Sequence, residues 1–325
     1  MSNRQACNES LPSSSAEPAD TALVRLGQRL RESGYRFITP TPLTHERVNA
    51  REHNRQARSL RDVFGWNRPF EPSLIAPELD LMSQADMIEE RDGLLQSKVR
   101  WSSLDDLLLV HSGFPTTAQD SVFFGPDTYR FAKVIEAHLQ SSLHPIKRAA
   151  DIGCGTGAGA LLIARARRDA QVLALDINPG ALRLARINTS LAGLENVNCQ
   201  RSDVLQDVEG SFDLIVANPP YMQDPDQRAY RHGGDALGAD LSLRIVEESL
   251  PRLTLGGSLL LYTGVAIVEG EDPFLNTLRG RLDTAGLSWR YEELDPDVFG
   301  EELLTDSYAR VDRIAVVALT VTRLG

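Results

Sequence analysis

The sequence contains few cysteines. Three occur in 325 residues, at Cys7, Cys154 and Cys199, and none belongs to a Cys-x-x-Cys pair or to a cluster with histidine. An odd number of scattered cysteines argues against a disulfide framework and against a zinc site of ordinary ligand spacing. We therefore expect no metal and a reducing compartment, the cytoplasm.

Long apolar runs are also missing. Stretches such as Leu107–Val110 are far too short to cross a bilayer. Residues 1–20 are polar and rich in serine and proline, without the basic flank and apolar core of a signal peptide. We expect a disordered tail there and no membrane partner.

Positive charge is scarce relative to negative charge. The 34 basic and 45 acidic side chains give a formal net charge of −11. A general binder of nucleic acids or anionic membranes needs a positive field, so this balance favours neither, although one basic patch is not excluded. The length of 325 residues and the hydrophobic content of 42% fit a globular protein of two domains.

Residues 21–120 are predicted to form a small N-terminal domain. Apolar residues recur at helical spacing in Thr21–Glu32, and Thr44–Phe64 is expected to be an arginine-rich second helix. Gly93 and the alternating pattern of Lys98–Val110 predict a hairpin. Helices followed by a hairpin resemble a winged-helix arrangement.

Residues 121–325 are predicted to form an α/β domain, in which short apolar strands alternate with helices from Arg148 onward. This alternation predicts a mostly parallel sheet covered on both faces. The last two strands lack a helix between them and are expected to close the sheet as an antiparallel hairpin. The seven expected strands are 149–152, 172–176, 197–201, 212–217, 258–262, 289–294 and 313–322.

A glycine-rich turn follows the first of these strands. Asp151-Ile152-Gly153-Cys154-Gly155-Thr156-Gly157 opens the next helix, and its glycines let the backbone turn sharply and pass close to a ligand. The pattern is Gly-x-Gly-x-Gly and not the Gly-x-Gly-x-x-Gly of dinucleotide sites, so a nicotinamide cofactor is the weaker interpretation. A tight strand-to-helix turn without a ligand is the alternative.

Two acids follow the next two strands. Asp176 ends the second strand, where a carboxylate can accept hydrogen bonds from both hydroxyls of a ribose. A helix cap is the alternative for Asp176, with Asn178 as the better cap. Asp203 follows the third strand and can accept the amino group of an adenine, or simply be a solvated loop acid.

The tetrapeptide Asn218-Pro219-Pro220-Tyr221 follows the fourth strand. Two prolines fix φ and remove backbone donors, so the turn presents the Asn218 side-chain oxygen and the Pro219 carbonyl as acceptors. Two acceptors suit an NH2 group on a planar nitrogen, and Tyr221 offers a flat face to such a group. A proline-rich loop with a packed tyrosine is the alternative.

The order and spacing of these features resemble the class I S-adenosylmethionine-dependent methyltransferases. The resemblance implies a seven-stranded Rossmann-like sheet, S-adenosyl-L-methionine as cofactor, no metal, and catalysis by Asn218 with Pro219, Pro220 and Tyr221 on an amino or amide nitrogen. It makes residues 121–325 the methyltransferase domain and residues 21–120 the domain that recognises the substrate. The implied cofactor-binding residues are Asp151, Gly153, Cys154, Gly155, Gly157, Asp176, Ile177, Asp203, Val204 and Asn218.

Within this group the sequence is most similar to the HemK-like protein-glutamine methyltransferases. Residues 232–238 resemble that family's Gly-Gly-Asp-Gly-Leu segment, and residues 124–128 stand where it has Pro-Arg-Pro-Glu-Thr. The arginine of that segment is absent, Tyr262 stands where the family's strand usually ends in glutamate, and residues 294–300 do not match. For Asp127 and Thr128, helix capping and direct contact with a ligand remain equal alternatives.

The acceptor implied by this resemblance is a protein glutamine side chain, with an amino group of an RNA or DNA base as the alternative. Arg47, Arg51, Arg55 and Arg58 recur at helical spacing, and such a row can contact phosphates of a structured RNA. A solvated helix face, partly neutralised by neighbouring acids, is the simpler interpretation. A small-molecule acceptor also stays open.

Overall fold

The computed structural model describes residues 18–224, 228 and 230–325. The expected tail therefore lies outside the described residues up to position 17, as does Cys7. Residues 18–20 belong to the first helix. The helices are α1 (Pro18–Glu32), α2 (Pro42–Asn49), α3 (Leu60–Phe64), α4 (Ala76–Gln84), α5 (Pro126–Ser141), α6 (Ala158–Ala166), α7 (Pro179–Ala192), α8 (Asp240–Ser249) and α9 (Pro273–Leu282).

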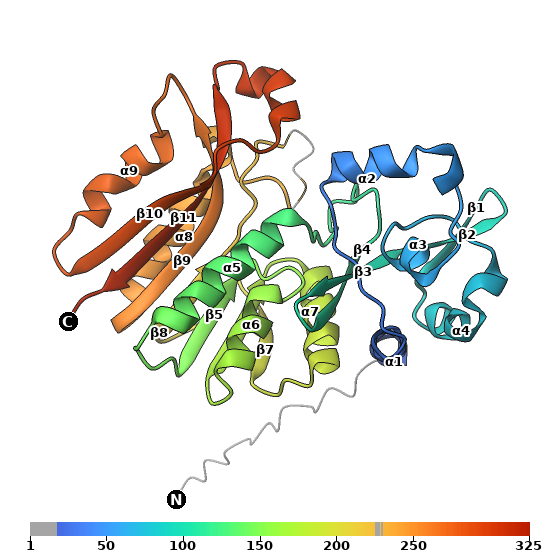
Figure 1. Ribbon diagram of the computed structural model, residues 1–325. Helices are drawn as coiled ribbons and strands as arrows, with labels where there is room; N and C mark the ends of the chain where they lie inside the picture. Colours follow the sequence, from blue (N-terminus) through green and yellow to red (C-terminus); the bar gives the residue numbers. More distant parts are fainter. Residues whose placement is uncertain (1–17, 225–227, 229) are drawn as a thin grey trace, which may run out of the picture.

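Seven strands form one central sheet, as the sequence predicts. Its order is β10-β11-β9-β8-β5-β6-β7; β9, β8, β5, β6 and β7 pair in parallel, whereas β11 is antiparallel to both β9 and β10. Figure 1 shows the two terminal strands, drawn in orange-red and dark red, at one edge of this sheet. The strands are β5 (Arg148–Ile152), β6 (Gln171–Asp176), β7 (Val197–Arg201), β8 (Phe212–Ala217), β9 (Leu253–Ile267), β10 (Leu287–Asp295) and β11 (Arg313–Arg323).

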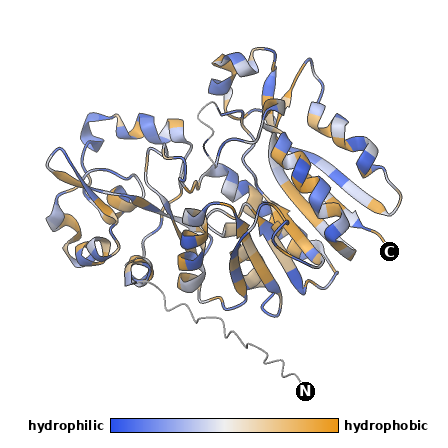
Figure 2. Ribbon diagram, turned by 180° about the vertical axis from the view of Figure 1, so that it is seen from behind, coloured by the Kyte–Doolittle hydropathy of each residue, from blue (hydrophilic) through white to orange (hydrophobic). Residues whose placement is uncertain are grey.

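Two apolar layers cover the sheet because successive side chains of a strand point to opposite faces. In β8, Leu214 and Val216 belong to the core shared with α5, α6 and α7, whereas Ile215 and Ala217 belong to the core shared with α8 and α9. Figure 2 shows the central strands of the sheet in orange, as hydrophobic segments. The central strands are thus buried on both sides, as in parallel sheets generally.

The N-terminal part differs from its prediction in two respects. The expected helix over 44–64 is three pieces, α2, a short 3-10 turn at Glu52–Asn54, and α3. The buried Asn54 amide donates to the Val48 carbonyl at 2.8 Å, and Ser59 caps a new helix. The arginines from Arg47 to Arg58 therefore do not line one helix face.

Two hairpins, and not one, follow these helices. The pairs are β1 (Ile88–Arg91) with β2 (Leu94–Ser97), and β3 (Val99–Leu104) with β4 (Leu107–Ser112). Asp92 and Gly93 form the first turn with φ of 52° and 78°, the left-handed conformation that two-residue hairpins favour.

The N-terminal elements pack on the central domain through α7. Their core includes Leu184, Ile187 and Leu191 of that helix, and Figure 1 shows α7 beside β3 and β4. The fully buried Asn188 joins three elements: its amide exchanges hydrogen bonds of 2.8 and 3.1 Å with the Val110 backbone and donates to the Thr156 carbonyl at 2.9 Å. The hairpin is therefore fixed to the same helix that supports the glycine turn.

None of the helices within residues 18–224 and 230–325 has the length and apolar character needed to cross a membrane.

Candidate active site

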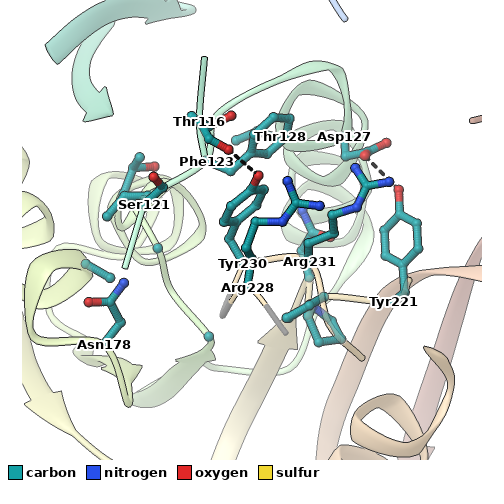
Figure 3. A pocket seen from close by; sticks show the side chains of 18 of the residues that line it. Thr116, Ser121, Phe123, Asp127, Thr128, Asn178, Tyr221, Arg228, Tyr230 and Arg231 are labelled. Atoms are coloured by element: carbon teal, nitrogen blue, oxygen red, sulfur yellow. Dashed lines mark hydrogen bonds between the residues drawn. The ribbon is translucent and has the colours of Figure 1, made fainter. Parts of the chain in front are cut away.

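A cavity of about 510 Å³ lies at the carboxyl ends of the parallel strands. Ligands bind at this edge in open α/β sheets. Its wall contains the glycine turn, the residues after β6 and β7, and the turn after β8, which the sequence placed together. Figure 3 shows part of this wall from close by. The N-terminal part also contributes, through α2 and residues 114–117.

The glycine turn adopts a conformation that requires glycine. Gly153, Gly155 and Gly157 have φ of 66°, 52° and 81°, in the left-handed region. Gly153 and Gly155 line the cavity, but Gly157 does not. An added Cβ at Gly157 would lie 3.2 Å from Ala185 Cβ, so this glycine permits close packing of α6 and α7. A cofactor contact for Gly157 therefore has no support in the cavity wall.

Asp151 holds the start of α6. Its carboxylate is buried and accepts a hydrogen bond from the Ala160 backbone at 2.8 Å. Burial raises the pKa of Asp151 from its ordinary 3.8 to about 7. Asp151 also lines the cavity. Cys154 lines it as well, and burial raises the pKa of its thiol, so it is not an activated nucleophile.

Asp176 bridges the glycine turn and the loop after β6. Its two carboxylate oxygens accept hydrogen bonds from the backbones of Gly155, at 3.0 Å, and Asn178, at 2.9 Å. Burial raises the pKa of Asp176 against the opposing effect of these bonds. Asn178 caps α7 through Gly180, as expected. Each oxygen of Asp176 keeps a lone pair for a further donor in the cavity.

The loop after β7 carries Asp203 and Val204, and both line the cavity. The carboxylate of Asp203 is about half exposed and forms an ion pair with Arg244. This contact agrees with the simpler interpretation of a solvated loop acid. Ile177, an apolar side chain that is 51% exposed, lies in the same wall.

Asn218, Pro219 and Pro220 line the cavity directly after β8. Across the part of the chain that the structure describes, no residue forms a hydrogen bond with the Asn218 amide. Tyr221 is buried, and its hydroxyl donates to the Asp127 carboxylate at 2.7 Å. The turn is therefore held through its tyrosine, while the asparagine amide keeps its hydrogen-bonding groups available to a ligand.

Asp127 and Thr128 both line the cavity, and direct contact of either with a ligand stays a prediction. Thr128 caps α5, with its hydroxyl accepting from the Gly125 backbone at 3.4 Å. Asp127 makes side-chain contacts and accepts from the hydroxyls of both Tyr221 and Tyr262. Neither contact has a local sequence signal, because the partners lie 94 and 135 residues away.

Further residues of the wall were not identified from the sequence. The rings of Phe123 and Tyr230 stack with centroids 5.7 Å apart, and the Tyr230 hydroxyl donates to the Thr116 carbonyl at 2.5 Å. Figure 3 shows this stack beside Arg228 and Arg231. The aromatic spacing in the sequence has no period that would reveal the stack.

The two arginines of the wall bind a buried acid. Asp224 accepts from the Arg228 side chain at 2.8 Å and lies 3.5 Å from Arg231. The hydrogen bonds from Arg228 hold the pKa of Asp224 below its usual value.

No group of three or more metal-ligating side chains occurs among the residues that the structure describes. The expectation that the site needs no metal stays a prediction.

Comparison with known proteins finds similarity over the central part of the chain. Residues 130–267 match the family model "Methyltransferase small domain". The chain is 38% identical to the release factor glutamine methyltransferase of Deinococcus radiodurans over 165 residues, which cover 48% of this chain and 55% of that protein. It is 34% identical to the Escherichia coli protein of the same name over 129 residues, 36% of this chain and 46% of that protein.

The chain thus spans about half the length of these curated relatives. A solved structure of a ribosomal protein L11 methylase from Lactobacillus delbrueckii is 21% identical, with a TM-score of 0.41, covering 62% of this chain and 81% of that one. Residues 130–267 therefore resemble a methyltransferase small domain, in a chain similar over part of its length to release factor glutamine methyltransferases.

Proposed function

We propose that this protein is an S-adenosylmethionine-dependent N-methyltransferase that modifies the amide nitrogen of a protein glutamine side chain. The observation that carries this proposal is the position of Asn218 and Pro219, which line the same cavity as the glycine turn. The names of the curated relatives support glutamine as the acceptor.

The cavity fits the cofactor in size and chemistry. A volume of about 510 Å³ lies within the range of small-molecule sites. Asp176 retains acceptor capacity for ribose hydroxyls, and Ile177 presents apolar surface that can cover a base. When bound, S-adenosylmethionine supplies a methyl group already activated by the sulfonium.

The residues after β8 suit the acceptor. The Asn218 side-chain oxygen and the Pro219 carbonyl can each accept one hydrogen of an NH2 group. Holding both hydrogens favours a nitrogen whose lone pair is no longer delocalised into its carbonyl, which is the geometry needed in the transition state. In-line placement of the methyl group and the acceptor nitrogen supplies much of the remaining catalysis, and no nucleophilic side chain is needed.

We also propose that residues 21–120 form the domain that recognises the acceptor. Leu43 and Glu46 of α2 line the cavity, so this domain contributes to its wall. The nucleic-acid alternative has lost its main support, because the four arginines that suggested it do not share one helix face.

Transfer of a labelled methyl group to a cell lysate tests the proposal. We expect labelling of a protein, with a signal that protease removes and nuclease does not. Glutamine methylation predicts that total hydrolysis releases labelled methylamine. A signal removed by nuclease would establish the base amino-methyltransferase instead, and a label on a small molecule would contradict both.

Calorimetry separates the cofactor from the acceptor. We expect S-adenosylhomocysteine to bind to the purified protein and NADH not to bind. Binding of NADH alone would contradict the proposal and favour an oxidoreductase.

A further inference from the structure

A buried hydrogen-bonded network lies beside the proposed acceptor position and is centred on Asp127, in the first turn of α5. One carboxylate oxygen accepts from the Tyr221 hydroxyl at 2.7 Å, and the other accepts from the Tyr262 hydroxyl at 2.7 Å. Arg130 donates to the second oxygen at 3.2 Å. Figure 3 shows the Tyr221 hydroxyl directed at Asp127. Three donors thus occupy the carboxylate of a residue that is only 7% exposed.

The network joins segments that are distant in sequence. Tyr221 belongs to the turn after β8, and Tyr262 lies within β9. Arg130 also donates to Asp295, at the end of β10, at 2.7 Å. The loop that follows β10 carries Phe299, which lines the cavity. Asp127 and Arg130 therefore connect α5 to the turn after β8, to β9 and to the end of β10.

Packing leaves the Tyr221 ring little freedom. A Cβ added at Gly264 would lie 2.2 Å from Cδ2 of Tyr221, so the ring rests directly on the β9 backbone. The Phe299 ring approaches edge-on, with centroids 6.0 Å apart. Burial raises the pKa of the Tyr221 hydroxyl, which keeps the phenol neutral and able to donate to Asp127.

We propose that Asp127 is a positioning residue, which fixes the Asn218–Tyr221 turn against the acceptor nitrogen through its hydrogen bond to the Tyr221 hydroxyl. This inference rests on the proposed function. Hydrogen bonds from a hydroxyl to a carboxylate are short and stronger than neutral ones, so this contact can restrict the turn more than apolar packing alone. Because its oxygens already accept three donors, Asp127 orients the turn and does not take a proton from the substrate.

A double-mutant cycle tests the inference. Tyr221→Phe keeps the ring and removes the tethering hydroxyl, and Asp127→Asn removes the charge of the acceptor. We expect each variant to lower kcat about tenfold or more, because small misplacements of reacting groups are costly. The double variant should be no slower than the slower single variant, since both changes break one contact.

Tyr291→Phe is the matched control. The Tyr291 hydroxyl also donates to a carboxylate, Asp272, at 2.5 Å, but this pair does not line the cavity. We expect wild-type kcat in this variant. In all variants the dissociation constant for S-adenosylhomocysteine should stay within about twofold of wild type. The reason is that loss of the Asp127–Tyr221 contact leaves the cofactor-side contacts of Asp176 intact.

Different results would contradict the positioning role of Asp127 and the proposed function. Wild-type kcat in Tyr221→Phe or Asp127→Asn, or losses that multiply in the double variant, would overturn the positioning role and leave the proposed function intact. An equal loss in Tyr291→Phe would show a general effect of buried tyrosine hydroxyls and would also overturn it. A wild-type protein that transfers no methyl group would overturn the proposed function, and this inference with it.

Discussion

The two ends of the cavity are built from different kinds of contact. At the end that we propose for the cofactor, the Asp176 carboxylate is held by backbone N–H groups of Gly155 and Asn178. At the proposed acceptor end, the turn after β8 is held by side chains, through Tyr221 and Asp127. The first end depends on a local strand–turn–helix geometry, and the second on packing between distant segments.

This difference predicts that substitutions at the two ends act on separate steps. Changes among residues 151–178 should weaken cofactor binding or local stability. Changes around Asn218 and Asp127 should lower turnover while the cofactor remains bound. A substitution at either end that weakened cofactor binding and lowered turnover equally would contradict this separation.

The largest effect on cofactor binding is expected at Asp176. Asp176→Ala removes a charged acceptor for ribose hydroxyls and should weaken S-adenosylhomocysteine binding about a hundredfold, since hydrogen bonds to charged groups contribute about 1.5–3 kcal/mol. Calorimetry measures this directly, with circular dichroism to verify folding. The exposed Asp169 offers a matched control, and Asp169→Ala should bind as wild type does. Unchanged binding in Asp176→Ala would remove the ribose role.

A smaller effect, on stability, is expected at Gly159 of α6, which lies against Asp151. A Cβ at Gly159 would lie 2.8 Å from the Asp151 carboxylate. Gly159→Ala should therefore lower the free energy of unfolding by about 1–3 kcal/mol, as measured by urea denaturation. Gly280 in α9 has open space around it, so Gly280→Ala should instead stabilise by about 0.5–1 kcal/mol. If both variants changed the free energy of unfolding by the same amount, the result would argue against the close approach of Gly159 to the Asp151 carboxylate.

A further effect concerns the dependence of stability on pH. The pKa of Asp151 rises on folding from 3.8 to about 7, so the folded state binds this proton more tightly than the unfolded state. Its contribution to stability is full below about pH 4 and is lost as pH rises toward 7. The side chain in Asp151→Asn does not titrate. The unfolding free energy of this variant should therefore fall less steeply with rising pH than that of wild type, by up to about 1.4 kcal/mol per pH unit. The measurement compares unfolding free energies of variant and wild type from pH 4 to 7; parallel curves would contradict the raised pKa.

The parts of the fold with local signals follow from the sequence. The bounds expected for β7 and β8 agree with the structure, because strand periodicity and turn residues lie within a few positions of each element. The strand expected over 258–262 is longer, β9 (Leu253–Ile267), since its antiparallel partner β11 pairs with it as far as Ile267. That extension depends on a segment about 50 residues away.

The candidate site divides in the same way. The glycine turn, Asp176 and Asn218 were predictable because each lies at the carboxyl end of a strand of a parallel sheet. The partners of Tyr221 were not, since Asp127 and Phe299 reach it through tertiary contacts. The break in the helix expected over 44–64 also depends on a distant contact, in which the Ala57 backbone donates to the Pro69 carbonyl at 2.8 Å.

The most direct test of the account compares Asn218→Ala with Asn276→Ala, a change of an exposed amide on α9. For each variant, kcat for methyl transfer and the dissociation constant of S-adenosylhomocysteine are measured together. We predict that Asn218→Ala lowers kcat about a hundredfold or more while the cofactor analogue binds within about twofold of wild type, and that Asn276→Ala changes neither. Full transfer by Asn218→Ala would contradict the claim that this turn holds the acceptor nitrogen.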